Sequence, residues 1–421
     1  MANKKSARAR WKRVSAAGLL TLIILFELTA FALLAFREST PDVNAFILGG
    51  ILVVLLLFQY LTLTSIFRHL DRYILIIANL LVAIGLIVQY RIDPEIAFRQ
   101  VTWFAVGMVA MYVCILLMRR PNFFRKLTLV IMIACAGVMM ALFVLGSEKY
   151  GATNWIIIGD NSLQPSELVK AGTVFILAHW LANAKRLRGI WPLLLYVVAV
   201  VGMLVLQRDL GAAVLIALTA LIVFYVATGN KGLTVLGLGA GCAGAVAGYF
   251  MFDHVRVRVA IWKNPWATYT GSGYQIAQGL MAIASGGVFG MGLTRGSPKL
   301  IPAYHTDYIF AVICEEFGII FGVAVIALYL ALIVRGALVA LNAPDRYTML
   351  IAFGCTVLIT LQSFIIIAGV IKLIPLTGIT MPFVSYGGSS LLSSMILLGI
   401  LEGVAIAGGE TLEKSLREIE V

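Results

Sequence analysis

Charged residues are scarce in this sequence of 421 residues. Only 12% are Asp, Glu, Lys or Arg, about half of the roughly 25% found in soluble domains, which argues against a soluble globular chain. The five cysteines are spread along the chain without a CxxC spacing, so they indicate neither a disulfide framework nor a structural zinc site. HExxH, P-loop and Ser-His-Asp patterns are missing, which argues against a zinc protease or an ATPase.

Hydrophobic residues are abundant instead, at 61% of the chain with a mean hydropathy of +0.99. They form blocks close to the roughly 20 residues that cross a bilayer, without the alternation of a barrel strand. Because lipid cannot satisfy backbone hydrogen bonds, these blocks should be helices. The sequence therefore predicts an all-α polytopic membrane protein with about twelve transmembrane helices. We expect them at 14–36, 44–66, 73–90, 99–118, 124–146, 165–183, 191–206, 212–228, 232–252, 309–334, 348–371 and 386–407.

The distribution of cations predicts the orientation. Residues 1–13 form a basic segment ahead of the first helix, and roughly 20 of the 32 Lys and Arg residues fall on its side of the membrane. We therefore expect both termini, including a tail of residues 408–421, to be cytoplasmic. The cations are scattered over short loops, which argues against nucleic-acid binding. Between the termini, residues 14–146 should hold five helices, and residues 147–407 hold most of the polar motifs.

Polar residues gather on the predicted outer side. The loop of residues 253–308 is unusually long for a membrane protein, and such loops are usually functional. Glu167 and Lys170 form an i, i+3 pair at a helix start, which is either part of a site or a helix-end salt bridge. Glu315 and Glu316 are adjacent in a helix, so at least one of them should face the interior of the bundle.

Other candidates also have a structural alternative. Arg208 and Asp209 lie between two hydrophobic helices and could form only a solvated turn. Thr306 and Asp307 are residue types favoured at helix N-caps. His305 alone is an ordinary loop residue. The glycine-rich stretch 285–292 could consist of turns alone.

Six strings along the chain resemble the SEDS family, named for shape, elongation, division and sporulation, to which RodA, FtsW and SpoVE belong. The resemblance runs in order from about residue 151 to residue 407. The strings are GATNW at 151–155, QPSELVK at 164–170, RDLG at 208–211, GSGYQIAQ at 271–278, HTDYIFAVICEEFG at 305–318 and PLTGITMPFVSYGGSS at 375–390.

The resemblance implies a peptidoglycan glycosyltransferase of the bacterial cytoplasmic membrane, which polymerises lipid II on the outer face. It implies a class B penicillin-binding protein as the crosslinking partner, together with other elongasome or divisome membrane proteins. Family members have about ten transmembrane helices, so two of the first five here are expected to be additions. The family's usual PDLG reads RDLG here, and we expect a looser turn at Arg208.

The resemblance also implies roles for residues. Asp307 matches the family's essential acid, and we predict that it is the general base that accepts the proton of the attacking sugar hydroxyl. Lys170 and Arg208 are the candidate cations for the leaving diphosphate. A divalent cation, Mg²⁺ or Mn²⁺, is possible with Asp307, Asp209 and Glu167 as ligands, and no organic cofactor is expected. The remaining predicted substrate-binding residues are Trp155, Gln275, His305, Thr306, Glu315, Glu316 and Ser385.

Two other functions remain open from the sequence. The main alternative is a transporter that flips lipid II, and the third is a noncatalytic scaffold for a transpeptidase. A transporter should place its polar residues near the midplane of the membrane, whereas here they cluster at the outer face. The shared strings do not distinguish the elongation, division and sporulation branches.

Overall fold

The computed structural model describes residues 15–37, 39–149, 152–159, 161–183 and 189–420. The basic segment 1–13 lies outside the described residues. Ten helices in the described ranges are long and apolar enough to cross a membrane. They are α1 (Ala16–Ala35), α2 (Val43–Ile66), α3 (Arg72–Ile92), α4 (Pro94–Met118), α5 (Pro121–Leu145), α8 (Leu210–Thr228), α9 (Lys231–Met251), α12 (Ile309–Leu341), α13 (Arg346–Val370) and α14 (Gly388–Glu420).

Two further helices, α6 (Pro165–Ala182) and α7 (Trp191–Leu206), occupy the remaining predicted segments. Each of the twelve predicted ranges thus corresponds in order to one helix, and the all-α polytopic prediction is confirmed. Short polar residues define where several of these helices begin. Asp42, Asp71, Asp93 and Asp345 precede α2, α3, α4 and α13, and each carboxylate accepts a backbone N–H of the first turn.

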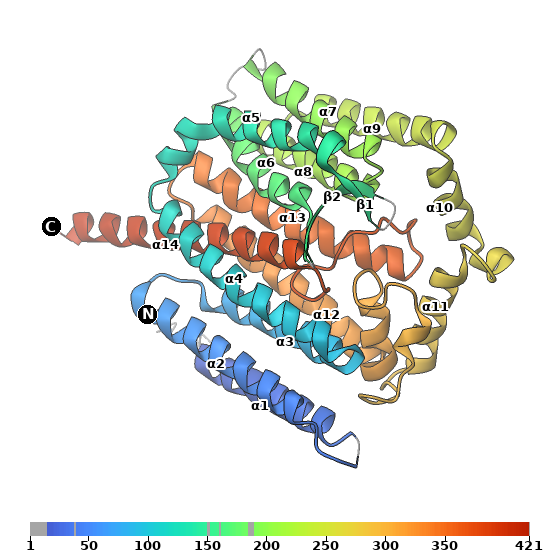
Figure 1. Cartoon of the computed structure of the whole chain (residues 1–421). Helices are drawn as coiled ribbons and strands as arrows, with labels where there is room; N and C mark the ends of the chain where they lie inside the picture. Colours follow the sequence, from blue (N-terminus) through green and yellow to red (C-terminus); the bar gives the residue numbers. More distant parts are fainter. Residues whose placement is uncertain (1–14, 38, 150–151, 160, 184–188, 421) are drawn as a thin grey trace, which may run out of the picture.

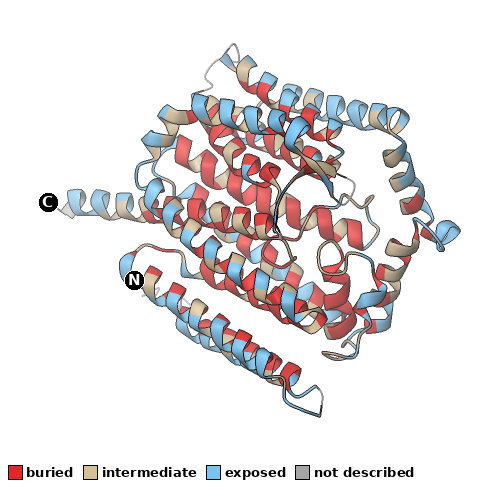
Figure 2. Ribbon diagram, viewed as in Figure 1, coloured by how far each residue is buried: buried red, intermediate tan, exposed pale blue. Residues whose placement is uncertain are grey.

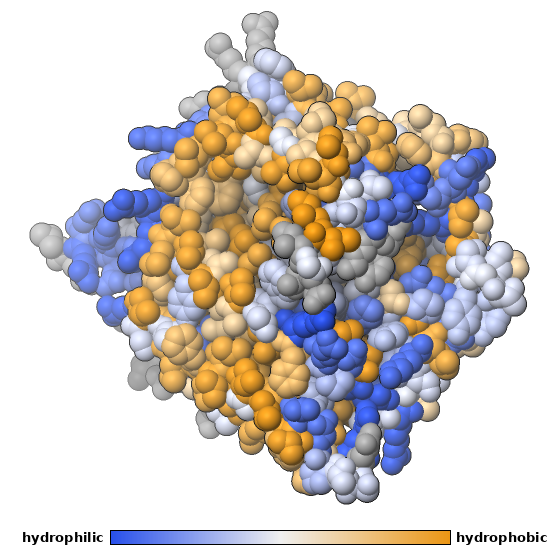
Figure 3. Space-filling view, viewed as in Figure 1, coloured by the Kyte–Doolittle hydropathy of each residue, from blue (hydrophilic) through white to orange (hydrophobic). Residues whose placement is uncertain are grey.

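The helices run back and forth, so that α1 begins and α14 ends on the same side of the molecule (Figure 1). We call this side the terminal face. The opposite side, the loop face, carries a small sheet, two short helices and the segment 371–387. Figure 3 shows apolar side chains across the middle of one view, with hydrophilic side chains toward both ends, as a bilayer requires.

Burial separates a central layer from a periphery (Figure 2). Helices α3 and α13 are buried over most of their length, as is the part of α14 that packs against α4. Helices α1 and α2 form a hairpin at one edge, packed on α3. Helix α9 has no buried residue and lies at the opposite edge, against α8. The polar motifs are therefore held by the central helices, while the edge helices face lipid.

Two segments predicted as loops are ordered. Three short strands form an antiparallel sheet: β1 (Ser147–Lys149), β2 (Ala152–Ile158) and β3 (Asn161–Leu163). The long loop contains the helices α10 (Asp253–Lys263) and α11 (Tyr274–Gly286), with 3₁₀ turns η2 (Pro265–Thr268) and η3 (Pro298–Leu300). Both segments lie on the loop face and cover the ends of the central helices.

The predicted helix end at residue 407 is too early, because α14 continues without a break to Glu420, whereas the cytoplasmic location of the tail 408–421 stays a prediction. Ion pairs along and beside the helix stabilise this extension. Glu413 pairs with Arg417 one turn later at 2.6 Å and with His69 at 2.9 Å. Glu410 pairs with Arg119 of the α4–α5 connection at 3.1 Å. The hydropathy pattern predicts that the last helix ends at residue 407, whereas these ion pairs stabilise the helix beyond that residue.

Helix α12 is broken at Gly318, where φ is +87° and ψ is 169°. The break frees backbone groups, and the glycine-rich loop after α11 satisfies them. Met291 and Gly292 donate to the carbonyls of Glu315 and Glu316, each at 2.9 Å. Beyond the break, the N–H of Ile319 donates to the carbonyl of Gly287 at 3.0 Å. The stretch 285–292 is thus more than turns alone: it docks against the helix.

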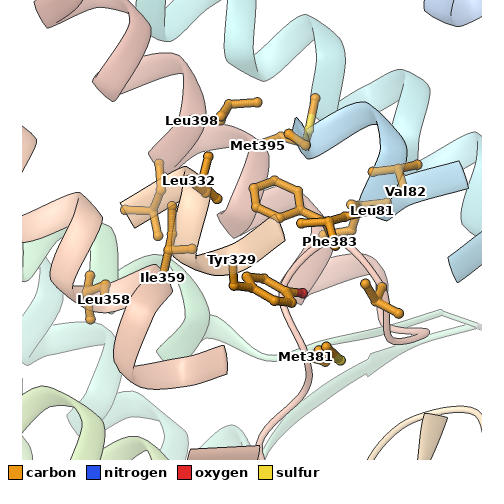
Figure 4. Close-up of a cluster of buried hydrophobic side chains, with 14 of the residues drawn as sticks. Leu81, Val82, Tyr329, Leu332, Leu358, Ile359, Met381, Phe383, Met395 and Leu398 are labelled. Carbon is orange, nitrogen blue, oxygen red and sulfur yellow. The ribbon is translucent and has the colours of Figure 1, made fainter. Parts of the chain in front are cut away.

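The segment between α13 and α14 does not stay on the surface. Residues 381–385 enter the bundle, where Met381 and Phe383 pack among α3, α12, α13 and α14 (Figure 4). Non-helical backbone at this depth needs hydrogen-bond donors. The amide of Gln89 donates to the carbonyl of Val384 at 2.8 Å, and the hydroxyl of Tyr329 donates to the carbonyl of Pro382. We call residues 381–385 the re-entrant segment.

Candidate functional site

Asp307 lies on the loop face, two residues before α12. It does not cap that helix, because the N-cap residue is Tyr308 and no side chain caps the first turn. Its carboxyl is only partly exposed. Burial raises the pKa of Asp307 to about 6, although a hydrogen bond with Thr306 and the charge of Arg258 both lower it. A carboxylate with that pKa is suited to accept a proton near neutral pH.

The re-entrant segment and Tyr386, which follows it, hold the backbone just ahead of Asp307. The hydroxyl of Ser385 donates to the carbonyl of Thr306 at 2.6 Å and accepts the N–H of Met381 at 2.9 Å. The N–H of Tyr386 donates to the carbonyl of His305 at 2.9 Å. Ser385, predicted to bind substrate, is buried and acts here as a link between two loops. His305 and Thr306 are linked to it through their carbonyls.

Arg258 of α10 is a residue that the sequence analysis missed. Its Nη1 donates to the carbonyls of Leu376 and Thr377, at 3.3 and 3.2 Å. Burial lowers the pKa of Arg258, and the carboxylates of Asp307 and Asp209 act against that shift. The only signal in the sequence is the basic character of the segment 253–263. Its partners are backbone groups more than a hundred residues away, which leave no motif.

The turn at residues 376–379 is the point where these elements meet. Arg258 donates to two of its carbonyls, and a Cβ at Gly378 would lie 3.7 Å from the Oδ2 atom of Asp307. The start of α8 touches the same turn, because a Cβ at Gly211 would lie 2.9 Å from the carbonyl oxygen of Thr377. Carboxylate and guanidinium are thus held by one turn on the loop face.

Arg208 adds a second cation to this region. It is exposed and has a φ of +63°. Proline is confined to φ near −65°, so the turn differs in backbone conformation from one that contains proline. Burial lowers the pKa of His254, and the charges of Arg258 and Arg208 lower it further. Arg258, which acts on the Asp307 carboxyl, and Arg208 are thus two permanent positive charges that both act on His254.

Asp209 supports the structure around this region. Its carboxylate accepts the N–H of Ala212 at 3.0 Å and thereby caps α8. The side chains of Asn154 and Gln164 also donate to it, at 2.7 and 3.0 Å. The interpretation of Arg208 and Asp209 as a solvated turn is wrong for Asp209, which is buried. Its lone pairs are occupied by N–H donors from β2, the start of α6 and α8.

Glu167 and Lys170 form a buried ion pair of 2.6 Å within α6. The ammonium of Lys170 also donates to the Oε1 atom of Gln362 at 2.9 Å, and Gln362 donates in turn to the carbonyl of Thr380. Lys170 is therefore enclosed by the bundle, and its described partners are internal. A role for Lys170 in binding the diphosphate stays a prediction.

Glu315 and Glu316 both face the interior, as the sequence predicted for at least one of them. Glu316 pairs with Arg91 of α3 at 2.9 Å, and Glu315 accepts the N–H of Ser297 at 3.1 Å. They connect the first half of α12 to α3 and to the loop after α11. The amide of Gln275 donates to the carbonyl of Pro302 at 3.3 Å, on the surface.

The predicted metal ligands do not assemble into a metal site. Within the described ranges, no three His, Cys, Asp or Glu residues are grouped so as to hold an ion. The carboxylate of Asp209 is occupied by amide donors, and that of Glu167 by Lys170. Trp155, in β2, is half-buried beside Asn154. The described residues thus offer no preformed three-ligand site; a divalent cation held by Asp307 together with substrate phosphates stays a prediction, and the chemistry below uses none.

Residues 63–408 match the family of cell cycle proteins that contains FtsW, RodA and SpoVE. The chain belongs to this family. The match begins near the end of α2, so α1 and most of α2 precede it. The resemblance inferred from the six strings is therefore confirmed, and it extends through α3, α4 and α5 as well.

Relatives from different branches of the family are similar to the chain. The peptidoglycan glycosyltransferase RodA of Mycobacterium bovis is 35% identical over 367 residues, covering 80% of this chain and 78% of its own. Stage V sporulation protein E of Bacillus subtilis is 34% identical over 357 residues, which cover 80% of this chain and 96% of its own. A solved structure that describes the structural coordination of polymerization and crosslinking by a peptidoglycan synthase complex contains a similar chain. The two chains superimpose with a TM-score of 0.69 at 26% identity, and the match covers 80% of this chain and 97% of the other.

Proposed function

We propose that this protein polymerises lipid II into glycan strands on the outer face of the cytoplasmic membrane, as a peptidoglycan glycosyltransferase. The observation that carries the proposal is the partly buried carboxyl of Asp307, on which the guanidinium of Arg258 acts on the loop face. Glycosyl transfer needs both a proton acceptor and a stabiliser of negative charge. The names of the relatives support the reaction class.

Asp307 is the general base in this proposal. A sugar hydroxyl is a weak nucleophile, and its proton must leave as the new glycosidic bond forms. With a pKa of about 6, Asp307 is mostly ionised at pH 7.5 and remains basic enough to accept the proton. The anomeric carbon loses its diphosphate as the hydroxyl oxygen attacks, so one bond forms while one breaks. The re-entrant segment keeps the carboxyl in place throughout.

Arg258 and Arg208 stabilise the leaving diphosphate. Guanidinium groups bind phosphate oxygens with two parallel hydrogen bonds and stay charged at all working pH values. Arg258 is already anchored by two carbonyls, so little conformational entropy is lost when it binds an anion. Arg208 is exposed and completes the pair from the α7–α8 turn. The enclosed position of Lys170 favours these two arginines over it.

The proposed orientation places the loop face outside the cell and both termini in the cytoplasm. Arg68, Arg119, Arg125 and Arg335 lie on the terminal face, in agreement with the excess of cations on cytoplasmic sides. Asp307, Arg258 and Arg208 then meet a lipid-linked sugar in the outer leaflet. The expected partner is a class B penicillin-binding protein, and the peptidoglycan synthase complex that resembles this chain supports that expectation.

Purified protein with labelled lipid II in detergent tests the proposal. Wild-type protein, with its penicillin-binding partner present, should form long glycan polymer, and Asp307→Ala should form none while keeping its elution volume and partner binding. Detergent offers no second leaflet, so polymer from the wild type excludes a flippase as the sole activity. Polymer from Asp307→Ala at the wild-type rate would refute the base assignment. Transport of lipid II across vesicles by a wild type that forms no polymer would instead favour the flippase.

A further inference from the structure

A second polar cavity lies on the loop face, away from Asp307. Its volume is about 640 Å³, and it is enclosed by three segments: the α1–α2 turn, the end of α3 with the start of α4, and the loop 294–299. One of its three walls, formed by residues 34–37 and 40–42, precedes the part of the chain that matches the family. The cavity therefore depends on helices added to the family core.

The cavity has a positive lining. Arg37, Arg91 and Lys299 line it, and Asp42 is the acid among its described lining residues. The carboxylate of Asp42 is already engaged, because it accepts the hydroxyl of Tyr90 at 2.7 Å and the N–H of Asn44 at 3.0 Å. The excess charge favours an anionic ligand.

Arg91 gives the cavity a fixed donor. Its side chain is 11% exposed, and its guanidinium is held by the ion pair with Glu316 and by two hydrogen bonds from Nη2 to the carbonyls of Thr294 and Gly296, both at 3.0 Å. A guanidinium has five N–H donors, and these contacts use one side of it. The Nη1 edge remains for a ligand in the cavity. Lys299 is exposed at the rim and forms no ion pair within the described residues.

The flank of the cavity is apolar and aromatic. Phe36 and Phe46 stack edge to face at 5.7 Å, and both are exposed, as is Val43 at the start of α2. These side chains lie at the ends of spanning helices, at the level of lipid headgroups. Cationic residues next to exposed apolar helix ends suit a molecule with an anionic head and hydrocarbon chains.

We propose that this cavity binds the phosphate headgroup of an anionic membrane lipid, with the acyl chains along the exposed face of α1 and α2. The phosphate oxygens accept from Arg91, Arg37 and Lys299. A lipid held there connects the α1–α2 hairpin to the loop 294–299, and through Glu316 to the first half of α12. The site is separate from Asp307 and gives the added helices a binding role of their own.

Native mass spectrometry of the full chain in detergent tests this site, with phosphatidylglycerol and phosphatidylcholine as probes. The double variant Arg37→Gln/Lys299→Gln should bind phosphatidylglycerol roughly 30-fold more weakly, because each Lys or Arg near an anionic headgroup contributes about a fivefold effect. The matched control Arg256→Gln/Lys263→Gln removes one Arg and one Lys from α10 on the same face, outside the cavity. Its affinity should stay within about twofold of wild type.

The outcomes separate the possible ligands. Equal binding of the two lipids by the wild type, or unchanged affinity in the cavity variant, overturns the proposal. Displacement of phosphatidylglycerol by inorganic phosphate at equal concentration would mean that the site takes a free anion, which overturns the lipid assignment. Asp307→Asn should bind the lipid like the wild type, so this result is independent of the polymerase test.

Discussion

The pH dependence of polymerisation tests the environment of Asp307 directly. With a pKa of about 6, roughly 97% of the carboxyl is ionised at pH 7.5, half at pH 6 and roughly 9% at pH 5. If Asp307 is the general base, the rate should therefore fall about tenfold between pH 7.5 and pH 5. Arg258 favours the ionised form. Arg258→Gln removes that charge, so the midpoint of the profile should move to higher pH.

The control is Arg258→Lys, which keeps the charge but not the planar pair of hydrogen bonds. It should lower the rate at every pH while leaving the midpoint close to wild type. Initial rates with labelled lipid II in detergent, from pH 5 to pH 8.5, give midpoint and plateau separately. The plateau reports diphosphate binding, and the midpoint reports the charge near Asp307. A midpoint in Arg258→Gln equal to that of the wild type would refute the electrostatic coupling of the two residues.

Three further predictions follow from the packing. Asp307→Asn should be inactive yet raise the free energy of unfolding at pH 7.5 by up to about 3 kcal/mol, because burial raises the pKa of Asp307 from 3.8 to about 6 and its ionisation therefore destabilises the fold progressively from about pH 4 to pH 6 and fully at higher pH; an unchanged melting temperature contradicts this. Lys170→Ala leaves the Glu167 carboxylate buried and unpaired and should cost about 3–5 kcal/mol in thermal unfolding, whereas Lys170→Met/Glu167→Leu should recover most of it; an equally unstable double variant would contradict the ion-pair account. Gly318→Ala puts a Cβ 2.4 Å from the Gly290 nitrogen at a φ of +87° and should greatly reduce folded yield, while Gly241→Ala, with open space around it, serves as the control and should not.

Hydrophobic length predicted the spanning helices because the bilayer sets the length that a helix must have. The ends of the helices were less predictable, since caps and ion pairs set them. Helix α4 begins at Pro94, five residues before the predicted start, because Asp93 caps it and Arg99 pairs with Glu95 across its first turn. Charged first turns lower the local hydropathy, so a hydropathy pattern alone excludes them.

The site was only partly predictable for a different reason. Asp307 was found through resemblance, and the structure adds what acts on it. Ser385 and Arg258 act through backbone carbonyls, at 306 and at 376–377. Every residue has a backbone carbonyl, so the identity of the accepting residue gives no sequence signal for such a hydrogen bond. The prediction placed Glu316 with the substrate as a charged residue in the same string as Asp307, and Ser385 as part of another family string, whereas their side chains hold the loops around Asp307.

The broken helix explains the glycines at 318 and in the stretch 285–292. Asp307 precedes a half-helix that ends at Gly318, and a break inside a membrane bundle is stable only if other backbone replaces the lost hydrogen bonds. A loop can supply these backbone hydrogen bonds only if its own backbone comes very close to the helix. A side chain would prevent this approach, because a Cβ at Gly290 would lie 2.2 Å from the Glu316 carbonyl oxygen and a Cβ at Gly286 would lie 2.1 Å from the Cys314 carbonyl oxygen. The glycines therefore allow this close approach of backbone to backbone. The half-helix is anchored at its far end by this loop and at its start by the re-entrant segment, so the position of Asp307 is determined from both ends.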